Sequence, residues 1–523
     1  MALLACFAVF FLLTAAPGAV GQKGFLSIDC GLDANSNGYN DTNGVFYVPD
    51  GSFVDGGENH VVAADQEGKL DRPYRTLRSF PSGDRNCYAL PTVAGAKYLL
   101  RVVFFYGNYD GKDSSSTLQF DLYIGVDRWA TVKADGKHWY EALFMAWASW
   151  APVCLVKTDP HNTPFVSSVE LRTMGSGIYA DLKVNESMSL VVRGNTGSSN
   201  SVIRYSDDPY DRYWWPVQSG PLWKNISTVS PIKLDPNWPV PLSVMQTAIE
   251  AVSNNTKFIS KWQDLESDEY RVYLHFADFQ NTEIRQLNVT INELEPFLFI
   301  PPYLAHTVAR NVGWYKSKTT IYSITVGATT ASKLPVMINA FEFYTRIPNV
   351  NPKTLPRDCK HSPFIYSIPV SNMIYAGMRS VLGIQYQKYN SWYHQQGGPK
   401  LKGARGQVAW LRDAWSLDAI MAIKFEYGIK KNWMGDPCFP TALVWEGVGC
   451  SNTSGNTMTI ISLLESNGNS CIVQSPPEKN GNRAVIAIWV VVPVTTIGAL
   501  ILIYLIWRHK TKANDFSHSW YFL

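Results

Sequence analysis

The sequence predicts an all-β extracellular region followed by one membrane-spanning helix. Runs of alternating apolar and polar residues recur between Gly24 and Ile347, separated by Gly, Asn, Asp and Pro. An apolar run opens the chain, and a long stretch without a charge lies near its C-terminus. We therefore expect two tandem β-sandwich lobes, then a short α-helical segment that the motifs below assign to a repeat cap, a stalk and one transmembrane helix.

The two ends predict the topology. Leu3 to Leu13 followed by small residues is typical of a signal peptide over residues 1–21. Residues 484–507 would span roughly 36 Å as a helix, enough to cross a hydrocarbon core of about 30 Å. Basic residues follow at once, which predicts a cytoplasmic tail at 508–523. We expect a type I single-pass protein of the plasma membrane with its N-terminus outside the cell.

Composition favours folded, extracellular domains. About 460 residues lie between the two ends, enough for two to four domains. Aromatic residues make up 13% of the chain and charged residues only 17%, which argues against disorder, and a net charge of +3 predicts no nucleic-acid partner. The 18 tryptophans either fill sheet cores or in part line a ligand groove.

The cysteines and sequons fit an oxidising compartment. Cys6 lies in the signal peptide, so seven of the eight cysteines would be extracellular, and an odd number leaves one thiol over. No spacing resembles a zinc or redox site, so we expect no metal. Glycosylation is predicted at six Asn-X-Ser/Thr sequons: Asn40, Asn185, Asn225, Asn254, Asn288 and Asn452.

Residues 22–205 read as the first lobe. Alternation is clearest from Leu118 to Ile124, and the run YLLRVVFFY from Tyr98 to Tyr106 is more continuously apolar, as expected of a strand covered on both faces.

Residues 206–347 read as the second lobe, because runs such as YRVYLHF from Tyr270 to Phe276 and LNVTI from Leu287 to Ile291 repeat the scheme in comparable order. The connecting stretch RYSDDPYDRYWWP combines turn formers with aromatics, which predicts a packed bridge between the lobes.

Several motifs carry a family resemblance. They are IDCG at Ile28, FPSGDRNCYAL ending at Leu90, FYGNYD at Phe105, TPF at Thr163 and the run DDPYDRYW. Residues 24–347 resemble the malectin-like ectodomain of plant receptor-like kinases. The resemblance implies two β-sandwich lobes beside a short leucine-rich-repeat segment, above a membrane helix and a cytoplasmic kinase.

A second resemblance lies in residues 416–464. DAIMAIKFEYGIKKNWMGDPCFP and WEGVGC resemble the segment that introduces the repeats in the leucine-rich-repeat type of these receptors, including the Gly-Asp-Pro-Cys motif. Ile420, Ile423 and Tyr427 recur at helical spacing, which predicts a short amphipathic helix. We expect Cys438 and Cys450 to form a disulfide that staples the following turn and strand as a cap remnant.

The chain departs from this family in three places. The tail is too short for a kinase and holds no Gly-rich loop, His-Arg-Asp or Asp-Phe-Gly motif, which predicts a truncated form. Residues 465–483 lack repeat spacing and are expected to be a stalk, with Cys471 as the candidate unpaired thiol. Residues 348–415 read as an atypical linker or insert. Alternative splicing and gene-model error both remain open as causes.

We expect no enzyme, no catalytic residue and no cofactor. No pair of carboxylates is identifiable for glycoside hydrolysis, and neither a Gly-x-Ser-x-Gly elbow nor a His-x-x-x-His pair is present. His275 is expected to be a packed or surface histidine.

A binding role is better supported. Tyr106, Asn108, Tyr109 and Asp110 follow an apolar strand at its rim, where aromatic faces stack on ligands and Asn and Asp supply directional hydrogen bonds. The alternative is that Gly107-Asn108 is turn chemistry and the tyrosines pack the lobe. The resemblance implies a cell-wall carbohydrate or a secreted peptide as the ligand.

We therefore expect a membrane-embedded receptor-like protein without its own kinase, acting as a co-receptor or decoy. A full-length receptor-like kinase is the possible lateral partner. The alternative is a non-signalling tether that holds cell-wall polysaccharide to the membrane.

Overall fold

The structure is a computed structural model that describes most of the chain between residues 22 and 354 and two segments near the C-terminus. The described ranges are 22–113, 117–184, 186–197, 201–264, 268–348, 351, 353–354, 433–453 and 457–463. The expected signal peptide, cap helix, stalk, anchor and tail, and most of the insert, lie outside them. Within these ranges no helix is long and apolar enough to span a membrane.

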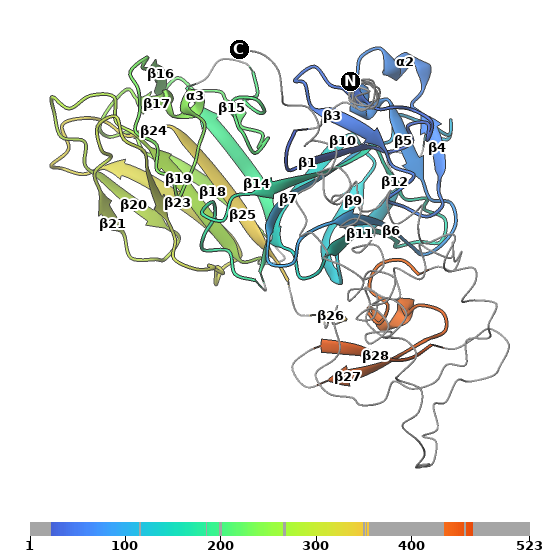
Figure 1. The fold of residues 1–523 in the computed structure, drawn as a ribbon. Helices are drawn as coiled ribbons and strands as arrows, with labels where there is room; N and C mark the ends of the chain where they lie inside the picture. Colours follow the sequence, from blue (N-terminus) through green and yellow to red (C-terminus); the bar gives the residue numbers. More distant parts are fainter. Residues whose placement is uncertain are drawn as a thin grey trace, which may run out of the picture. The chain divides into compact units, whose positions relative to one another are not determined.

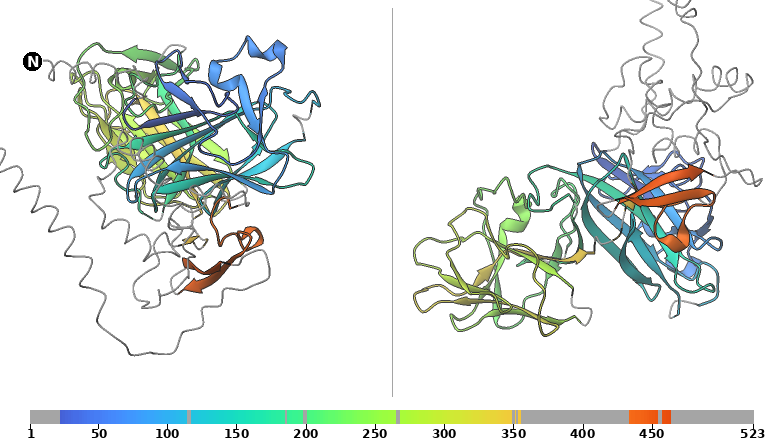
Figure 2. Two further views of the ribbon diagram at one scale, coloured as in Figure 1. Left: turned by 45° about the vertical axis from the view of Figure 1, so that its right-hand side comes forward. Right: turned by 90° about the horizontal axis from the view of Figure 1, so that it is seen from below.

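One antiparallel-rich sheet of 11 strands runs through residues 25–347. Strand β14 lies between β10 and β25, so the sheet continues without a break from the first half of this region into the second (Figure 1). Figure 2 shows the same strands, coloured along the sequence, in two turned views. In sheet order the strands are β2 (Tyr39–Asn40), β3 (Phe46–Pro49), β1 (Phe25–Asp29), β13 (Ser168–Met174), β7 (Lys97–Phe105), β10 (Lys137–Met145), β14 (Ser187–Thr196), β25 (Ala340–Ile347), β19 (Tyr270–Phe276) and β22 (Thr307–Arg310), with β15 (Trp215–Val217) paired to β14.

Smaller sheets complete two apolar cores. The first core joins one face of the long sheet to the sheet β6 (Arg85–Pro91), β11 (Trp150–Lys157), β8 (Gln119–Ile124), β9 (Asp127–Lys133) and to β12 (Phe165–Val166), β5 (Thr76–Ser79), β4 (Glu58–Val61). The second joins it to β18 (Phe258–Gln263), β23 (Ile321–Ala328), β20 (Leu287–Ile291), β21 (Phe297–Phe299) and to β16 (Trp223–Ser227), β17 (Thr247–Ala251), β24 (Met337–Ile338). The described helices are single turns: α2 (Ala64–Glu67), η1 (Arg72–Tyr74), α3 (Leu242–Met245) and η3 (Thr441–Leu443).

The strand periodicity appears as the sequence predicts. In β8 the even-numbered residues are buried in the first core, and in β20 Leu287, Val289 and Ile291 are buried in the second. Strand β7 is buried on both faces, because Leu100, Val102 and Phe104 enter the first core while Leu99 and Arg101 face the opposite side. The fold is mostly β, as expected.

The face of the long sheet that turns away from the cores carries a row of buried, alternating charges, which we call the charge ladder. Its members are Arg172, Glu170, Arg101, Glu141, Arg193 and Glu342, all with side chains at most 2% exposed. Successive partners lie 2.7–2.9 Å apart across the sheet from β13 to β25. The Arg193–Glu141 contact is an ion pair without an aligned hydrogen bond. The ladder joins the two halves because Arg193 contacts one carboxylate from each.

Residues 204–216 cover the ladder, so the bridge is packed as expected. Asp211 is fully buried and pairs with Arg172 at 2.9 Å, Arg204 at 2.8 Å and Arg101 at 3.4 Å. Burial alone would raise the pKa of Asp211, but these arginines hold it well below its usual range. Tyr213 lies over Arg101, with 3.6 Å from its ring centre to the guanidinium carbon.

At the far end of the ladder lie two buried histidines. His275 approaches Glu342 at 3.2 Å through Nε2 and His306 at 3.0 Å through Nδ1. Burial, together with His275 and Arg212, lowers the pKa of His306 to about 3. His275 is thus a packed histidine, as expected from the sequence.

Replacing Arg193 tests the ladder. Arg193→Leu would leave Glu141 and Glu342 buried without their shared cation, and we expect the free energy of unfolding to fall by about 3–5 kcal/mol. Urea denaturation measures it. The matched control is Arg128→Leu, which removes an ion pair to Asp121 whose arginine is 48% exposed and should cost less than about 1 kcal/mol. Equal losses in the two variants would contradict a special role for the ladder.

His306 predicts a pH dependence. The pKa of His306 is lower in the folded chain than in the unfolded chain. Protonation of this side chain therefore favours the unfolded chain, and the free energy of unfolding decreases as pH falls from about 6.5 toward 3. His306→Gln keeps a donor toward His275 and cannot titrate. We expect wild type to lose about 2 kcal/mol more than this variant between pH 7 and pH 5, measured by urea denaturation at both pH values. Parallel losses would contradict the prediction.

Candidate functional site

The candidate site begins with a tight turn after β7. Gly107 and Asn108 both have positive φ, +52° and +47°. Gly107 also packs closely against its neighbours, because a Cβ there would lie 2.5 Å from Val62 Cγ1. Its carbonyl accepts a hydrogen bond from the Ala63 amide at 2.8 Å. This turn directs residues 108–113 to the surface at the end of the strand.

Tyr106 supports the site from below. Its ring is buried in the first core, 5.9 Å from Phe165, and its hydroxyl donates a hydrogen bond to Asp110 Oδ1. Burial alone would raise the pKa of Asp110, but the Tyr106 hydroxyl and Lys112 lower it. Asp110 is therefore an ionised acceptor whose position is set from the core.

Tyr109 forms the aromatic part of the rim. It is half-buried, and its ring centre lies 5.4 Å from that of Tyr106 and 4.6 Å from that of His60. Burial and the neighbouring Asp110 raise its pKa to about 12, so its hydroxyl stays protonated and can donate. His60 Nε2 lies 2.9 Å from Ser79 Oγ, which ties this rim to β5.

The four residues predicted from the sequence do not have equal access to solvent. Tyr109, Asp110 and Asn108 are partly exposed, whereas Tyr106 is only 3% exposed. Asn108 Oδ1 accepts a hydrogen bond from the Asp113 amide at 3.0 Å, which folds the loop back on itself. Turn chemistry and packing thus explain part of the motif, while Tyr109 and Asp110 keep faces available to a ligand.

Sequence reasoning missed His60. It lies 49 positions before Tyr109 on β4, and the β4–β5 pairing together with the Ala63–Gly107 hydrogen bond brings it to the loop. The stretch that corresponds in the second half is structural: Phe276 is in the core, and buried Asp278 pairs with Arg285 at 2.8 Å. Among the described residues no cluster of His, Cys, Asp and Glu could hold a metal ion.

The cysteines and sequons can be placed in part. Cys87 and Cys154 form a disulfide between β6 and β11, and Cys438 forms one with Cys450. Cys30 is a buried free thiol, and Cys471 lies outside the described residues. Asn40, Asn225, Asn254 and Asn288 are exposed; the side chains of Asn185 and Asn452 are not described, and glycosylation stays a prediction at all six.

Comparison with known sequences decides the family. The Malectin-like domain matches residues 28–346, more than half of the chain. The chain belongs to the malectin-like family. In Arabidopsis thaliana it is 31% identical to a Probable LRR receptor-like serine/threonine-protein kinase, At1g51860, over 85% of this chain and 44% of that protein. Receptor-like protein kinase At5g59670 is 30% identical over 83% of this chain and 44% of that protein. The chain spans less than half the length of these relatives.

Solved structures of malectin-like ectodomains share the fold. The extracellular domain of ANXUR1 from Arabidopsis thaliana has a TM-score of 0.53 at 17% identity and covers 62% of this chain and 97% of that one. The structure of the plant peptide RALF23 in complex with FER and LLG2 has a TM-score of 0.51 at 15% identity, covering 62% and 95%. The family predicted from IDCG, FYGNYD and the related motifs is confirmed.

Replacing Asp110 tests whether Tyr106 stabilises the loop after β7. Asp110→Ala removes the carboxylate that accepts from the buried Tyr106 hydroxyl, and we expect a loss of about 1–3 kcal/mol in the free energy of unfolding. Lys112→Ala removes only the exposed ion pair to Asp110 and should cost less than about 1 kcal/mol. Chemical denaturation compares the two, and a loss no larger for Asp110→Ala would contradict support from Tyr106.

Proposed function

We propose that this malectin-like region is the ectodomain of a single-pass plasma-membrane protein of the receptor-like type, and that it binds an extracellular ligand. The observation that carries the proposal is the rim of Tyr109, Asp110 and Asn108, fixed from the core on a scaffold whose relatives are receptor-like kinases. We assign the lobes to residues 22–205 and 206–347, and the membrane span to residues 484–507.

The rim fits a hydroxyl-rich or peptide ligand. Tyr109 offers an aromatic face and a protonated hydroxyl, and Asp110 offers an ionised acceptor. Such groups stack on a sugar ring or an apolar side chain and accept hydrogen bonds from hydroxyls or amides. FER, a receptor-like kinase with the same fold, forms a complex with the peptide RALF23 and LLG2, which supports the peptide class. We assign this ectodomain no catalytic role.

The proposal includes a signalling partner. The curated relatives are kinases, but the chain spans less than half of their length, so we do not assign their activity to it. Lateral pairing with a full-length receptor-like kinase, as a co-receptor or decoy, is proposed from the sequence. The second candidate is a cell-wall tether, favoured only if the ligand is a polysaccharide.

Ligand binding is tested on secreted residues 22–483. Binding to cell-wall polysaccharides and to secreted cysteine-containing and linear peptides is measured for wild type and for the double variant Tyr109→Ala, Asp110→Ala. We expect affinity to fall at least about tenfold in the variant, because one stacking and one ionic contact are lost. Arg128→Gln, on an exposed site of β9, should bind as wild type.

The outcomes separate the candidates. Polysaccharide binding lost in the double variant supports a lectin-like ectodomain and keeps the tether open, whereas peptide binding alone removes the tether. Unchanged binding in a double variant that unfolds cooperatively would reject the rim as the ligand site.

A further inference from the structure

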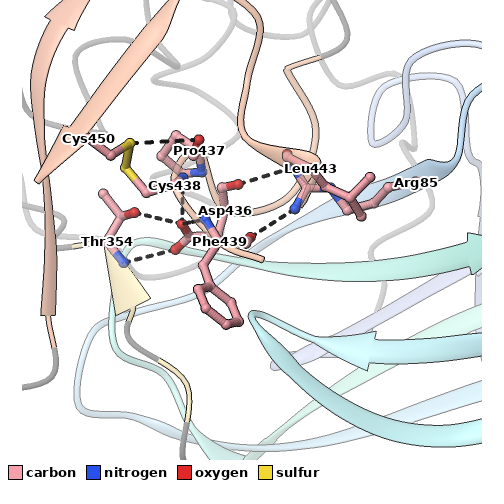
Figure 3. Close-up of a disulfide and its surroundings, with 8 residues drawn as sticks. All are labelled: Arg85, Thr354, Asp436, Pro437, Cys438, Phe439, Leu443 and Cys450. Carbon is pink, nitrogen blue, oxygen red and sulfur yellow. Dashed lines mark hydrogen bonds between the residues drawn. A yellow bond between two sulfur atoms is a disulfide. The ribbon is translucent and has the colours of Figure 1, made fainter. Parts of the chain in front are cut away.

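Residues 433–453 and 457–463 lie against the first sandwich, by which we mean the sheets around the first core, although they follow the second core in the chain. They form η3 and the antiparallel pair β27 (Val448–Thr453) and β28 (Thr457–Leu463), and β26 (Lys353–Thr354) pairs with β28. We call these two segments the terminal module. Figure 3 shows Asp436, Pro437 and Cys438 of its Gly-Asp-Pro-Cys turn beside Arg85 of β6.

Arg85 is the centre of this contact. Its guanidinium donates to three carbonyl oxygens of the terminal module: Phe439 at 2.9 Å, Asp436 at 3.1 Å and Leu443 at 2.7 Å (Figure 3). The side chain is buried. Burial lowers the pKa of Arg85 to about 10, and the charge of Asp436 offsets part of this effect. A buried cation whose hydrogen bonds go to carbonyl oxygens needs all of them in place.

The aspartate of the motif shapes the turn rather than pairing with Arg85. Its Oδ1 accepts hydrogen bonds from the amides of Cys438 at 2.9 Å and Phe439 at 3.0 Å. Its two oxygens also accept from the Thr354 hydroxyl at 2.6 Å and the Thr354 amide at 2.9 Å. The carboxylate thus ties the turn to β26 while the Asp436 carbonyl faces Arg85.

The glycine and cysteine of the motif bring the turn close to the sandwich. Gly435 has φ +69°, and a Cβ there would lie 3.1 Å from both Arg85 Cζ and Cys154 Sγ. The Cys438–Cys450 disulfide links the same turn to β27. The turn therefore packs on the Cys87–Cys154 disulfide at a distance that favours glycine.

Apolar packing surrounds this polar centre. Trp433 and Trp445 stack with ring centres 5.5 Å apart and form a small core with Val448 and Ile460. Trp150 of β11 packs against this core from the first sandwich. Contacts from β6 and β11 thus meet both the turn and the core of the terminal module.

We infer that the Gly-Asp-Pro-Cys turn is an intramolecular docking element for the first sandwich, with Arg85 as its positioning residue. The terminal module of the same chain covers the surface around Arg85 of β6 and Trp150 of β11, so this surface is closed to ligands and partners. The module and the first sandwich move as one body. This inference does not depend on ligand binding at Tyr109 and Asp110.

Hydrogen exchange on the full chain in detergent micelles tests it. In Arg85→Gln we expect the amides of β27 and β28 to exchange at least about tenfold faster than in wild type, while those of β8 and β9 keep their protection. Arg85→Lys should give an intermediate increase, because a single ammonium cannot reach all three carbonyls. Arg128→Gln on the same sheet should change nothing.

The variant Gly435→Val tests the same contact from the side of the terminal module. It leaves the first sandwich intact and should loosen β27 and β28 in the same way, which guards against a folding defect in Arg85 variants. Unchanged exchange of the terminal module in both Arg85→Gln and Gly435→Val would overturn the inference. Equal loss of protection in β6, β11 and the module would also overturn it, because Arg85 would then be a residue of the sandwich alone.

Discussion

The charge ladder is the constraint on which the rest of the molecule depends. Strand register places Arg101 opposite both Glu141 and Glu170, and Arg193 opposite Glu342. Because side chains alternate between faces, a register shift of one residue would turn these charged side chains into the apolar cores, where they would lack a charged partner. The ladder therefore selects one register across the sheet even where its net contribution to stability is small. The same charges join the two halves, since Arg193 needs a carboxylate from each.

This constraint also explains why the candidate site is a loop. The inner face of the long sheet is filled by two cores. The outer face is covered by residues 204–216 and by a third apolar cluster that includes Tyr179 and Leu182. Strand ends are left as positions from which side chains can reach a ligand. At the end of β7 the buried Tyr106 holds Asp110, so the rim is fixed by the same strand that carries Arg101. The loop of the candidate site is thus held in place by a buried residue directly after the strand.

Local pattern was enough to predict the strands and the family, but not how they combine. Alternation marked β8 and β20, and the motif FYGNYD marked the turn after β7. Nothing local shows that β14 pairs with β25, because that pairing depends on contacts about 150 positions apart. Buried Arg and Glu within strands read as solvent-facing residues until their cross-strand partners are known. His60 was missed for the same reason, since contacts between distant segments bring it to Tyr109.

The Gly-Asp-Pro-Cys motif shows this limit most clearly, because the sequence contains both sides of the contact without linking them. Arg85 stands about 350 positions before the carbonyls it meets, within the run FPSGDRNCYAL that helped to identify the family. A motif that looks like the start of a repeat array acts here as a contact to the first sandwich.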